Sequence, residues 1–220
     1  MDSRADILCY GNSEYSITEI AKRLKKNMDI DGIEGTCVSA KEIPKGFEEL
    51  PDFESISRND EQSKKNFCRM QIMFSNSKNL AQKHGNRYVL QHKMHDYTTK
   101  ELDEIYELPY SRDIPAKADY FKGMQFSIVT HRGCFGRCSF CSLPLHQGIK
   151  IVSRSEESIL NEIKRLTKHK DFMGYIDDLG GPSANMYGMD CNSNCDDCLN
   201  CAKLDKSHSR LIHLLRKARQ

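Results

Sequence analysis

The sequence lacks the features that would assign it to a membrane, secreted or nucleic-acid-binding class. No apolar run approaches the ~18 residues that a spanning helix needs. Nor does an apolar run of signal-peptide length follow the acidic start at residues 1–6. The 33 lysines and arginines nearly balance 31 acids, for a formal net charge of +2, which gives no reason to expect a nucleic acid or membrane partner. We therefore expect a globular protein of the cytoplasm.

Cysteine is the one residue in unusual supply. Ten are present, and seven of them lie between Cys134 and Cys201. In a reducing compartment, clustered cysteines more often hold metal or carry out redox chemistry than form disulfides. The remaining three, Cys9, Cys37 and Cys68, lack ligand-like spacing and are interpreted as ordinary small hydrophobic residues.

The first half of the chain predicts only a few regular elements. Apolar residues from Ile17 to Leu24 recur at helical spacing, and Ser16 with Glu19 has the pattern of a capping box. Residues 40–80 have a weak pattern, which favours a loop-rich connection with one helix.

A strand, a helix and a linker are expected next. Residues 87–91 read as a short strand. Thr98 begins a predicted helix, with Glu101 completing its capping box. Pro115 lies in a linker, and we place a domain boundary there.

The second half predicts a strand, a helix and a strand in succession. Residues 124–129 are apolar enough for a buried strand, Ser155 caps a helix with one apolar face, and residues 172–176 form a second strand. This order indicates a βαβ unit and a parallel sheet. A last helix is expected around residues 211–218.

A cysteine loop follows the first of these strands directly. Cys134, Cys138 and Cys141 have the spacing C-x3-C-x2-C. Three thiolates can bind three corners of a four-iron cube, and Gly133 and Gly136 supply the backbone freedom that wrapping needs. An ordinary cluster takes four cysteines. Three ligands leave one iron open to an outside molecule, and that open iron makes the site chemically reactive.

Zinc is the alternative for this loop. Zinc takes four ligands, usually from paired C-x2-C hooks. His131 or His146 could supply the fourth, so this interpretation stays open.

The loop resembles the signature of the radical S-adenosylmethionine (radical SAM) superfamily, in which Phe140 holds the position of the aromatic residue before the last cysteine. The resemblance implies that the open iron chelates S-adenosylmethionine through its amino and carboxylate groups. It further implies that an electron donor drives cleavage to a 5′-deoxyadenosyl radical, which abstracts hydrogen from a substrate. The chemistry belongs to the cofactor, and the protein positions it.

Gly180, Gly181 and Pro182 come after the second predicted strand. In the superfamily a Gly-Gly-Glu-like motif there offers backbone carbonyls to the amino group of S-adenosylmethionine. The resemblance therefore implies a cofactor-binding turn, without the carboxylate that Pro182 replaces. A simple tight turn is the alternative.

The resemblance can be narrowed to the YgiQ family of radical SAM proteins, and it is close from about residue 120 to 201. The substrate and product stay open. The motifs that carry this resemblance are Arg132-Gly133-Cys134-Phe135-Gly136, Ser153-Arg154-Ser155, Asp178-Leu179-Gly180-Gly181-Pro182-Ser183, Gly85-Asn86-Arg87-Tyr88 and Glu107-Leu108-Pro109-Tyr110.

A second set of cysteines consists of Cys191, Cys195, Cys198 and Cys201. Four thiols within eleven residues complete a ligand set for tetrahedral zinc or for a closed iron–sulfur cluster. Spacing does not separate these metals. We favour an auxiliary cluster over zinc.

The expected fold class is α/β: an incomplete parallel (β/α) radical SAM barrel at 116–220 with a cysteine-rich insertion, preceded by part of a smaller α/β domain at 1–115. A complete barrel of this type has about six units. The chain would therefore be a fragment, or a second polypeptide would complete the barrel. Besides a radical SAM enzyme, a non-catalytic iron–sulfur electron carrier and a zinc-binding interaction module remain as alternatives. No residue is assigned a catalytic role.

Overall fold

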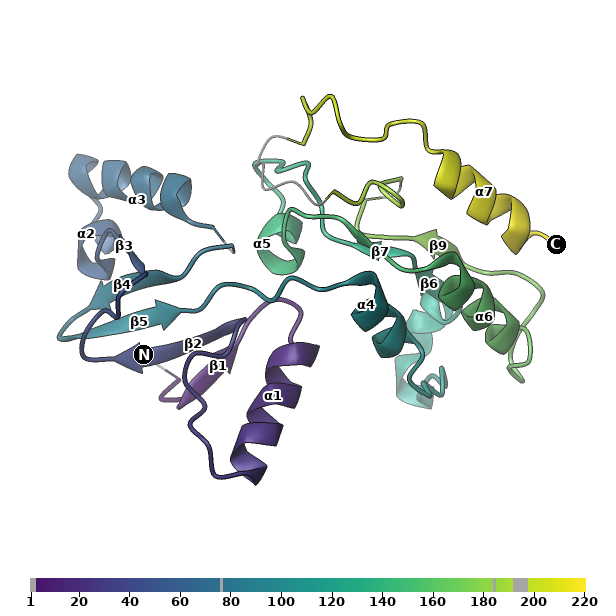
Figure 1. Ribbon diagram of the computed structural model, residues 1–220, viewed down its shortest axis with the longest axis horizontal. Coiled ribbons are helices and arrows are strands. Elements are labelled where there is room, and N and C mark those ends of the chain that lie inside the picture. Colours follow the sequence, from purple (N-terminus) through teal and green to yellow (C-terminus); the bar gives the residue numbers. More distant parts are fainter. Residues whose placement is uncertain (1–2, 76, 184, 192–197) are drawn as a thin grey trace. The chain divides into compact units, whose positions relative to one another are not determined.

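The computed structural model describes the chain except for residues 1–2, 76, 184 and 192–197 (Figure 1). It divides into two compact units, Met1–Asp96 and Tyr97–Gln220. This division lies before the boundary expected at Pro115. Helix α4 (Thr99–Tyr106) accounts for the difference, because it contacts α6 (Glu156–Leu166) and β8 (Val152–Ser153) of the second unit.

The first unit is built on a five-stranded mixed sheet in the order β1-β2-β5-β4-β3 (Figure 1). Neighbouring strands are antiparallel except for the parallel pair β3 and β4. The strand predicted at residues 87–91 is confirmed as β5. The strands are β1 (Ile7–Cys9), β2 (Thr36–Ala40), β3 (Glu48–Leu50), β4 (Leu80–His84) and β5 (Arg87–Gln91).

The helices of the first unit correct two expectations. Helix α1 (Glu14–Lys25) begins earlier than its supposed capping box, because Ser16 lies inside the helix, buried, with its hydroxyl donating to the Glu34 carbonyl at 2.8 Å. The interpretation of residues 40–80 as mostly loop is wrong. This region holds β3, α2 (Phe53–Ser57), α3 (Glu61–Met73) and β4.

One helix is expected within residues 40–80, but the bounds of α3 could not be predicted because most of its residues are polar and exposed, which leaves no apolar stripe to recognise. Its start does carry a local signal. Asp60 and Ser63 form a capping box in which each side chain accepts a hydrogen bond from the other's backbone N–H.

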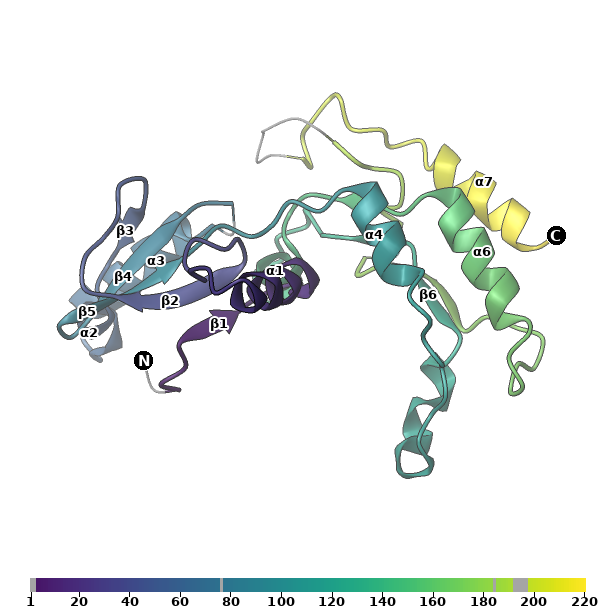
Figure 2. The same cartoon turned by 60° about the horizontal axis from the view of Figure 1, so that its bottom comes forward.

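The second unit contains the predicted βαβ arrangement. Strands β6 (Ser127–Val129) and β9 (Asp178–Gly180) pair in parallel, and α6 lies between them in sequence. Helix α6 packs beside α7 (Ser209–Ala218) (Figure 2). The α/β class and the parallel pairing are therefore confirmed; within the described residues of this unit, parallel pairing is confined to β6 and β9. The remaining elements are η1 (Ala116–Met124), β7 (His131–Arg132), α5 (Leu143–Gln147) and β8.

The first strand of the βαβ unit is shorter than predicted, and the second lies later in the chain than predicted. The first begins at Ser127, because the chain up to Met124 forms the 3-10 helix η1. The second is β9, downstream of the predicted residues 172–176. Phe172 and Ile176 pack against the core although they lie outside the strands. The Phe172 ring meets the Phe126 ring edge-on.

The core of the second unit lies between the β6–β9 pair and helices α6 and α7. The apolar face predicted for α6 is confirmed, with Ile159, Ile163 and Leu166 buried. In α7, Leu214 is fully buried, whereas Leu215 is 41% exposed. The buried members of this cluster are Phe126, Ile128, Ile159, Ile163, Leu166, Tyr187 and Leu214.

A buried arginine ties this unit together. Arg154 is fully buried and donates to the Glu162 carboxylate at 2.5 Å, the Val129 carbonyl at 2.9 Å and the Ser158 hydroxyl at 2.8 Å. Its guanidinium also lies over the Tyr106 ring of α4, 4.6 Å from the centroid. These contacts join α4, β6 and α6, so Arg154 stabilises the packing of these three elements.

None of the helices in the described part of the chain combines the length and apolar character needed to cross a bilayer.

Candidate cluster and cofactor site

The cysteine loop is closed at its base by one short strand pair and one further backbone hydrogen bond. Strands β7 and β8 pair antiparallel, with His131 opposite Ser153. Beyond them, the Cys134 N–H donates to the Gly148 carbonyl at 3.0 Å. The two ends of the loop therefore lie side by side, directly after the carboxyl end of β6.

Gly133 opens the loop at a position that only glycine can occupy. Its φ is +89°, and a Cβ atom there would lie 1.8 Å from the Lys150 carbonyl oxygen. Any side chain would collide with backbone and force the loop apart. Glycine is thus required at position 133 for two reasons: the positive φ and the close approach of the Lys150 backbone.

The first two thiols face a common space above Gly136. A Cβ atom on Gly136 would lie 3.5 Å from the Cys134 Sγ and 3.8 Å from the Cys138 Sγ. Cys134 is buried, Cys138 is exposed and Cys141 is partly buried, with its N–H donating to the Cys138 carbonyl at 2.9 Å. Both sulfur atoms therefore lie within van der Waals distance of one point above Gly136. This donor set and this cradle fit an iron–sulfur cluster.

The described geometry offers no preformed single-ion site in the loop. Neither His131 nor His146 joins two of its thiols in a group whose ligand atoms all lie within 4.8 Å of one another. The group that meets this criterion in the described part of the chain is Asp113, His169 and Asp171.

His169 is engaged as a structural link within that group. Its Nδ1 accepts from the Asp171 N–H, and its Nε2 lies 3.2 Å from the Ser111 carbonyl, as a donor in the same tautomer. Both nitrogens are therefore used, so this group does not compete with the cysteines.

Phe140 lies on the outer surface of the loop, 90% exposed. The structure shows no packing for its ring that would assign it to a cofactor, and its role stays a prediction.

The Gly-Gly turn lies beside the cysteine loop. Gly180 ends β9, and its carbonyl accepts from the Thr130 N–H at 2.6 Å. Thr130 immediately follows β6, so the loop and the turn begin at adjacent carboxyl ends of two parallel strands. This edge of a parallel sheet is where α/β proteins usually bind ligands.

Sequence reasoning considered His131 only as a zinc ligand. The structure places its imidazole, fully buried, against Gly181 of the turn. The signal available in the sequence was position alone: the residue directly follows the strand and precedes the loop.

The second cysteine set approaches the first loop through shared apolar packing. Phe135, next to Cys134, is buried with Ile151 and Met189, and Cys198 packs against this cluster. Cys191 and Cys201 are partly buried, and the predicted ligand Cys195 lies outside the described residues.

Asp190 anchors the start of this segment to the base of the cysteine loop. Its carboxylate accepts from the Ser153 N–H of β8 at 2.6 Å and from Arg210 at 3.1 Å. No motif suggested this residue, because its partners lie 37 and 20 positions away.

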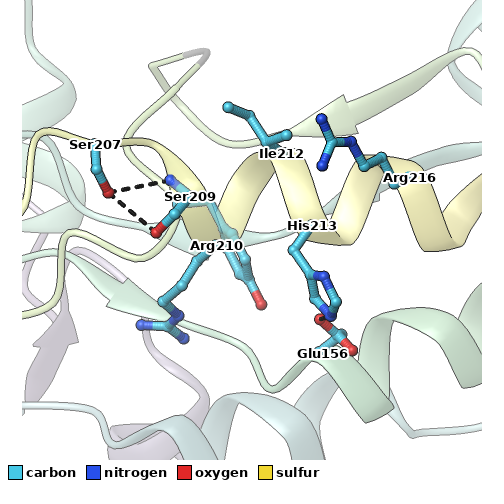
Figure 3. A pocket seen from close by; sticks show the side chains of 8 residues that line it. Glu156, Ser207, Ser209, Arg210, Ile212, His213 and Arg216 are labelled. Atoms are coloured by element: carbon cyan, nitrogen blue, oxygen red, sulfur yellow. Dashed lines mark hydrogen bonds and ion pairs between the residues drawn. The ribbon is translucent and has the colours of Figure 1, made fainter.

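A pocket lies along α7, beside the N-terminal end of α6 (Figure 3). Its charges are partly paired, since the Glu156 carboxylate contacts both Lys217 and His213. The hydrogen bond from Lys217 lowers the pKa of Glu156. Its lining includes no cysteine, so this pocket is separate from the candidate cluster site. The lining residues are Glu156, Tyr187, Ser207, Ser209, Arg210, Ile212, His213 and Arg216.

Comparison with known proteins connects the site with a family. Residues 1–125 match the family model described as "Radical SAM N-terminal". A "UPF0313 protein" of Methanocaldococcus jannaschii is 43% identical over 239 residues, covering all of this chain and 39% of the relative. The corresponding proteins of Methanocella arvoryzae and Clostridium botulinum are both 39% identical and again cover the whole chain.

The chain spans about two fifths of the length of these curated relatives. The match nevertheless runs through the cysteine loop, the Gly-Gly turn and the whole preceding unit. The chain therefore belongs to the radical SAM N-terminal family and, with its UPF0313 relatives, to the YgiQ-type radical SAM proteins.

Proposed function

We propose that this chain binds a [4Fe-4S] cluster through Cys134, Cys138 and Cys141 and uses the open iron to bind S-adenosylmethionine. Membership of the radical SAM family implies such a cluster, S-adenosylmethionine and a reductant in general. The observation that carries the proposal for these residues is the shared space above Gly136, which two of the three thiols face.

The protein contributes binding and orientation. The three thiolates hold the cluster, while the Gly180 and Gly181 backbone, at the adjacent strand end, receives the amino group of the cofactor. Pro182 adds no carboxylate to that contact. A cluster held by these thiolates would pass one electron, taken from the reductant, to the sulfonium, and this chemistry would cleave the S–C5′ bond to give methionine and a 5′-deoxyadenosyl radical.

The substrate, an electron donor and any polypeptide that completes the barrel are further partners in this proposal. The chain spans only part of its relatives, so the activity of a whole protein is proposed and not assigned to this segment alone. Action in the cytoplasm belongs to the same proposal.

We infer that the second cysteine set holds an auxiliary iron–sulfur cluster, with zinc as the alternative. The packing of Cys198 against the cluster of Phe135, Ile151 and Met189 supports this, because it brings one thiol of the set near Phe135, the neighbour of Cys134. A metal there would also compensate the mutual repulsion of neighbouring thiolates.

Anaerobic reconstitution followed by electron paramagnetic resonance tests the proposal. The reduced protein should show a [4Fe-4S] signal that shifts when S-adenosylmethionine is added, and 5′-deoxyadenosine should form. The matched control is Cys68→Ala, which removes an exposed thiol of the first unit and should leave the signal unchanged.

Two other results would each select an alternative function. A cluster signal that ignores S-adenosylmethionine indicates a non-catalytic electron carrier. A colourless protein that holds only zinc indicates an interaction module.

A further inference from the structure

His131 has an unsatisfied polar atom in a fully buried position. The side chain is 0% exposed, and its Nε2 has no hydrogen-bond partner among the described residues. The other nitrogen, Nδ1, lies 3.0 Å from the Thr130 hydroxyl. Buried polar atoms without partners are uncommon, and each calls for an explanation.

The face of this imidazole covers Gly181 of the Gly-Gly turn. A Cβ atom on Gly181 would lie 2.3 Å from Cε1, 2.5 Å from Nδ1 and 2.6 Å from Nε2 of His131. Such similar distances to three ring atoms place that Cβ over the face of the ring. The ring thus occupies the space where a side chain at position 181 would go, in contact with the turn backbone.

A second unsatisfied atom lies in the same turn. The Ser183 hydroxyl is also buried without a partner in the described part of the chain. Two unpartnered polar atoms, on His131 and on Ser183, indicate that this turn interacts with a polar group.

The ring is neutral at neutral pH. Burial lowers the pKa of His131 below its ordinary value and outweighs the opposite effects of the Ser183 backbone and the Asp190 carboxylate. A neutral imidazole carries one N–H. When the Thr130 hydroxyl donates to Nδ1, that N–H is on Nε2, the atom that lacks a partner.

His131 is also tied to the cysteine loop. It belongs to β7, whose pairing with β8 closes the base of the loop, and Cys134 follows three residues later. One side chain therefore connects the start of the cluster loop with the turn that follows β9.

We propose that His131 is a positioning residue for the amino-acid end of S-adenosylmethionine, acting through the Gly180–Gly181 turn that its ring covers. The inference rests on the proposed function. Shape alone does not suffice for this role: the imidazole fills the space above Gly181, and its ring nitrogens also interact with polar groups that include the Ser183 backbone.

The test measures cofactor affinity and cluster content separately on the reconstituted chain. Affinity is taken from the shift of the resonance signal during titration with S-adenosylmethionine, and iron and sulfide are assayed chemically. His131→Leu keeps apolar volume, His131→Gln keeps a polar end, and His146→Ala removes an exposed histidine from the same loop as the matched control.

We expect wild-type iron content in all three variants. Affinity should fall about tenfold in His131→Leu, which corresponds to about 1.4 kcal/mol. It should fall much less in His131→Gln and not at all in His146→Ala. Unchanged affinity in His131→Leu, or equal losses in the Leu and Gln variants, would overturn the proposal.

A size-complementation pair covers the case in which the His131 variants fold poorly. Gly181→Ala should weaken cofactor binding because its methyl group meets the ring, and His131→Ala in the same chain should restore part of the loss by removing the ring. No restoration would refute the contact. If the resonance signal of the wild-type chain does not change on addition of S-adenosylmethionine, the proposed function itself is wrong. That outcome is distinct from a failure of the His131 variants to lose affinity.

Discussion

The cysteines of the two units show what separates a ligand from an ordinary buried thiol. In the first unit, Cys9 and Cys37 lie on neighbouring strands, but Cys9 pairs with Thr36 and Cys37 with Leu8. Their side chains therefore point to opposite faces of the sheet. In the second unit, the Cys134 and Cys138 sulfurs face one space above Gly136. Neighbouring positions do not make a site; convergence of the donor atoms does.

Protonation reinforces this difference. Burial raises the pKa of the Cys37 thiol to about 11, with a smaller contribution from Cys9. A thiol with such a pKa stays protonated at neutral pH, and the thiolate is the form that binds metal. Burial thus disfavours the thiolate form of Cys37, in addition to the opposite orientation of the two side chains.

Removing the three loop thiols should give the largest difference between the cysteines of the two units. In Cys134→Ala/Cys138→Ala/Cys141→Ala, we expect the first cluster to be lost entirely, because one loop supplies all its protein ligands. Cys9→Ala/Cys37→Ala should retain the wild-type content. Iron and sulfide per chain after anaerobic reconstitution measure this, and equal contents in both variants would contradict the assignment.

Gly133→Ala should open the loop without touching a thiol. The new Cβ would lie 1.8 Å from the Lys150 carbonyl oxygen, so we expect a loss of at least about 3 kcal/mol in unfolding free energy together with loss of cluster. Gly174→Ala is the control, with φ +93° and nothing within 4 Å. It should lose only the strain of a left-handed residue, about 1–2 kcal/mol. Denaturant unfolding of both variants gives the difference, and similar losses would show that only φ matters.

Phe135→Ala should separate the two cysteine sets. Removing a buried phenylalanine costs about 3 kcal/mol in unfolding free energy, and here it also removes the packing that Cys198 shares. Metal bound by the second set should therefore fall as well. Phe140→Ala, which truncates a 90% exposed ring, should change stability by less than about 0.5 kcal/mol. Metal analysis that finds the second set unaffected in Phe135→Ala would argue against coupling.

The smallest effect concerns the pH dependence of the first unit. Because the folded pKa of Cys37 is about 11 and its ordinary value is 9.0, the folded form retains a proton that the unfolded form loses. Stability should fall as pH rises from about 9 to 11 and be unaffected by this thiol below that range. Cys37→Val should flatten the decline, whereas Cys68→Val should not. Unfolding followed by circular dichroism between pH 8 and 11 checks this, and identical slopes would contradict the burial effect.

Sequence reasoning succeeded where the signal is local. The capping box of Thr98 and Glu101 is confirmed at the start of α4, and Ser155 caps α6 by accepting from the Ser158 N–H. Both depend on residues three positions apart. The apolar face of α6 and the parallel βαβ order followed from periodicity and from the order of elements in the same way.

Prediction from the sequence failed where a residue is buried by partners far away in the chain. Phe172 and Ile176 looked like a strand because they are apolar, yet they pack against the core ahead of β9. Ser16 looked like a cap, but its hydroxyl bonds to the carbonyl of Glu34. The bounds of helix α3 were not predicted because an exposed polar helix has no periodic apolar pattern to detect.

For the candidate site, the amino-acid sequence by itself determined the donor set, its spacing and the glycines around it, because these lie within one short loop. Only the tertiary structure decided that Gly180 lies beside Thr130, that His131 faces Gly181 and that Phe135 packs with Cys198. Such contacts join residues about 50 to 60 positions apart. They depend on strand register and core packing, which local sequence does not encode.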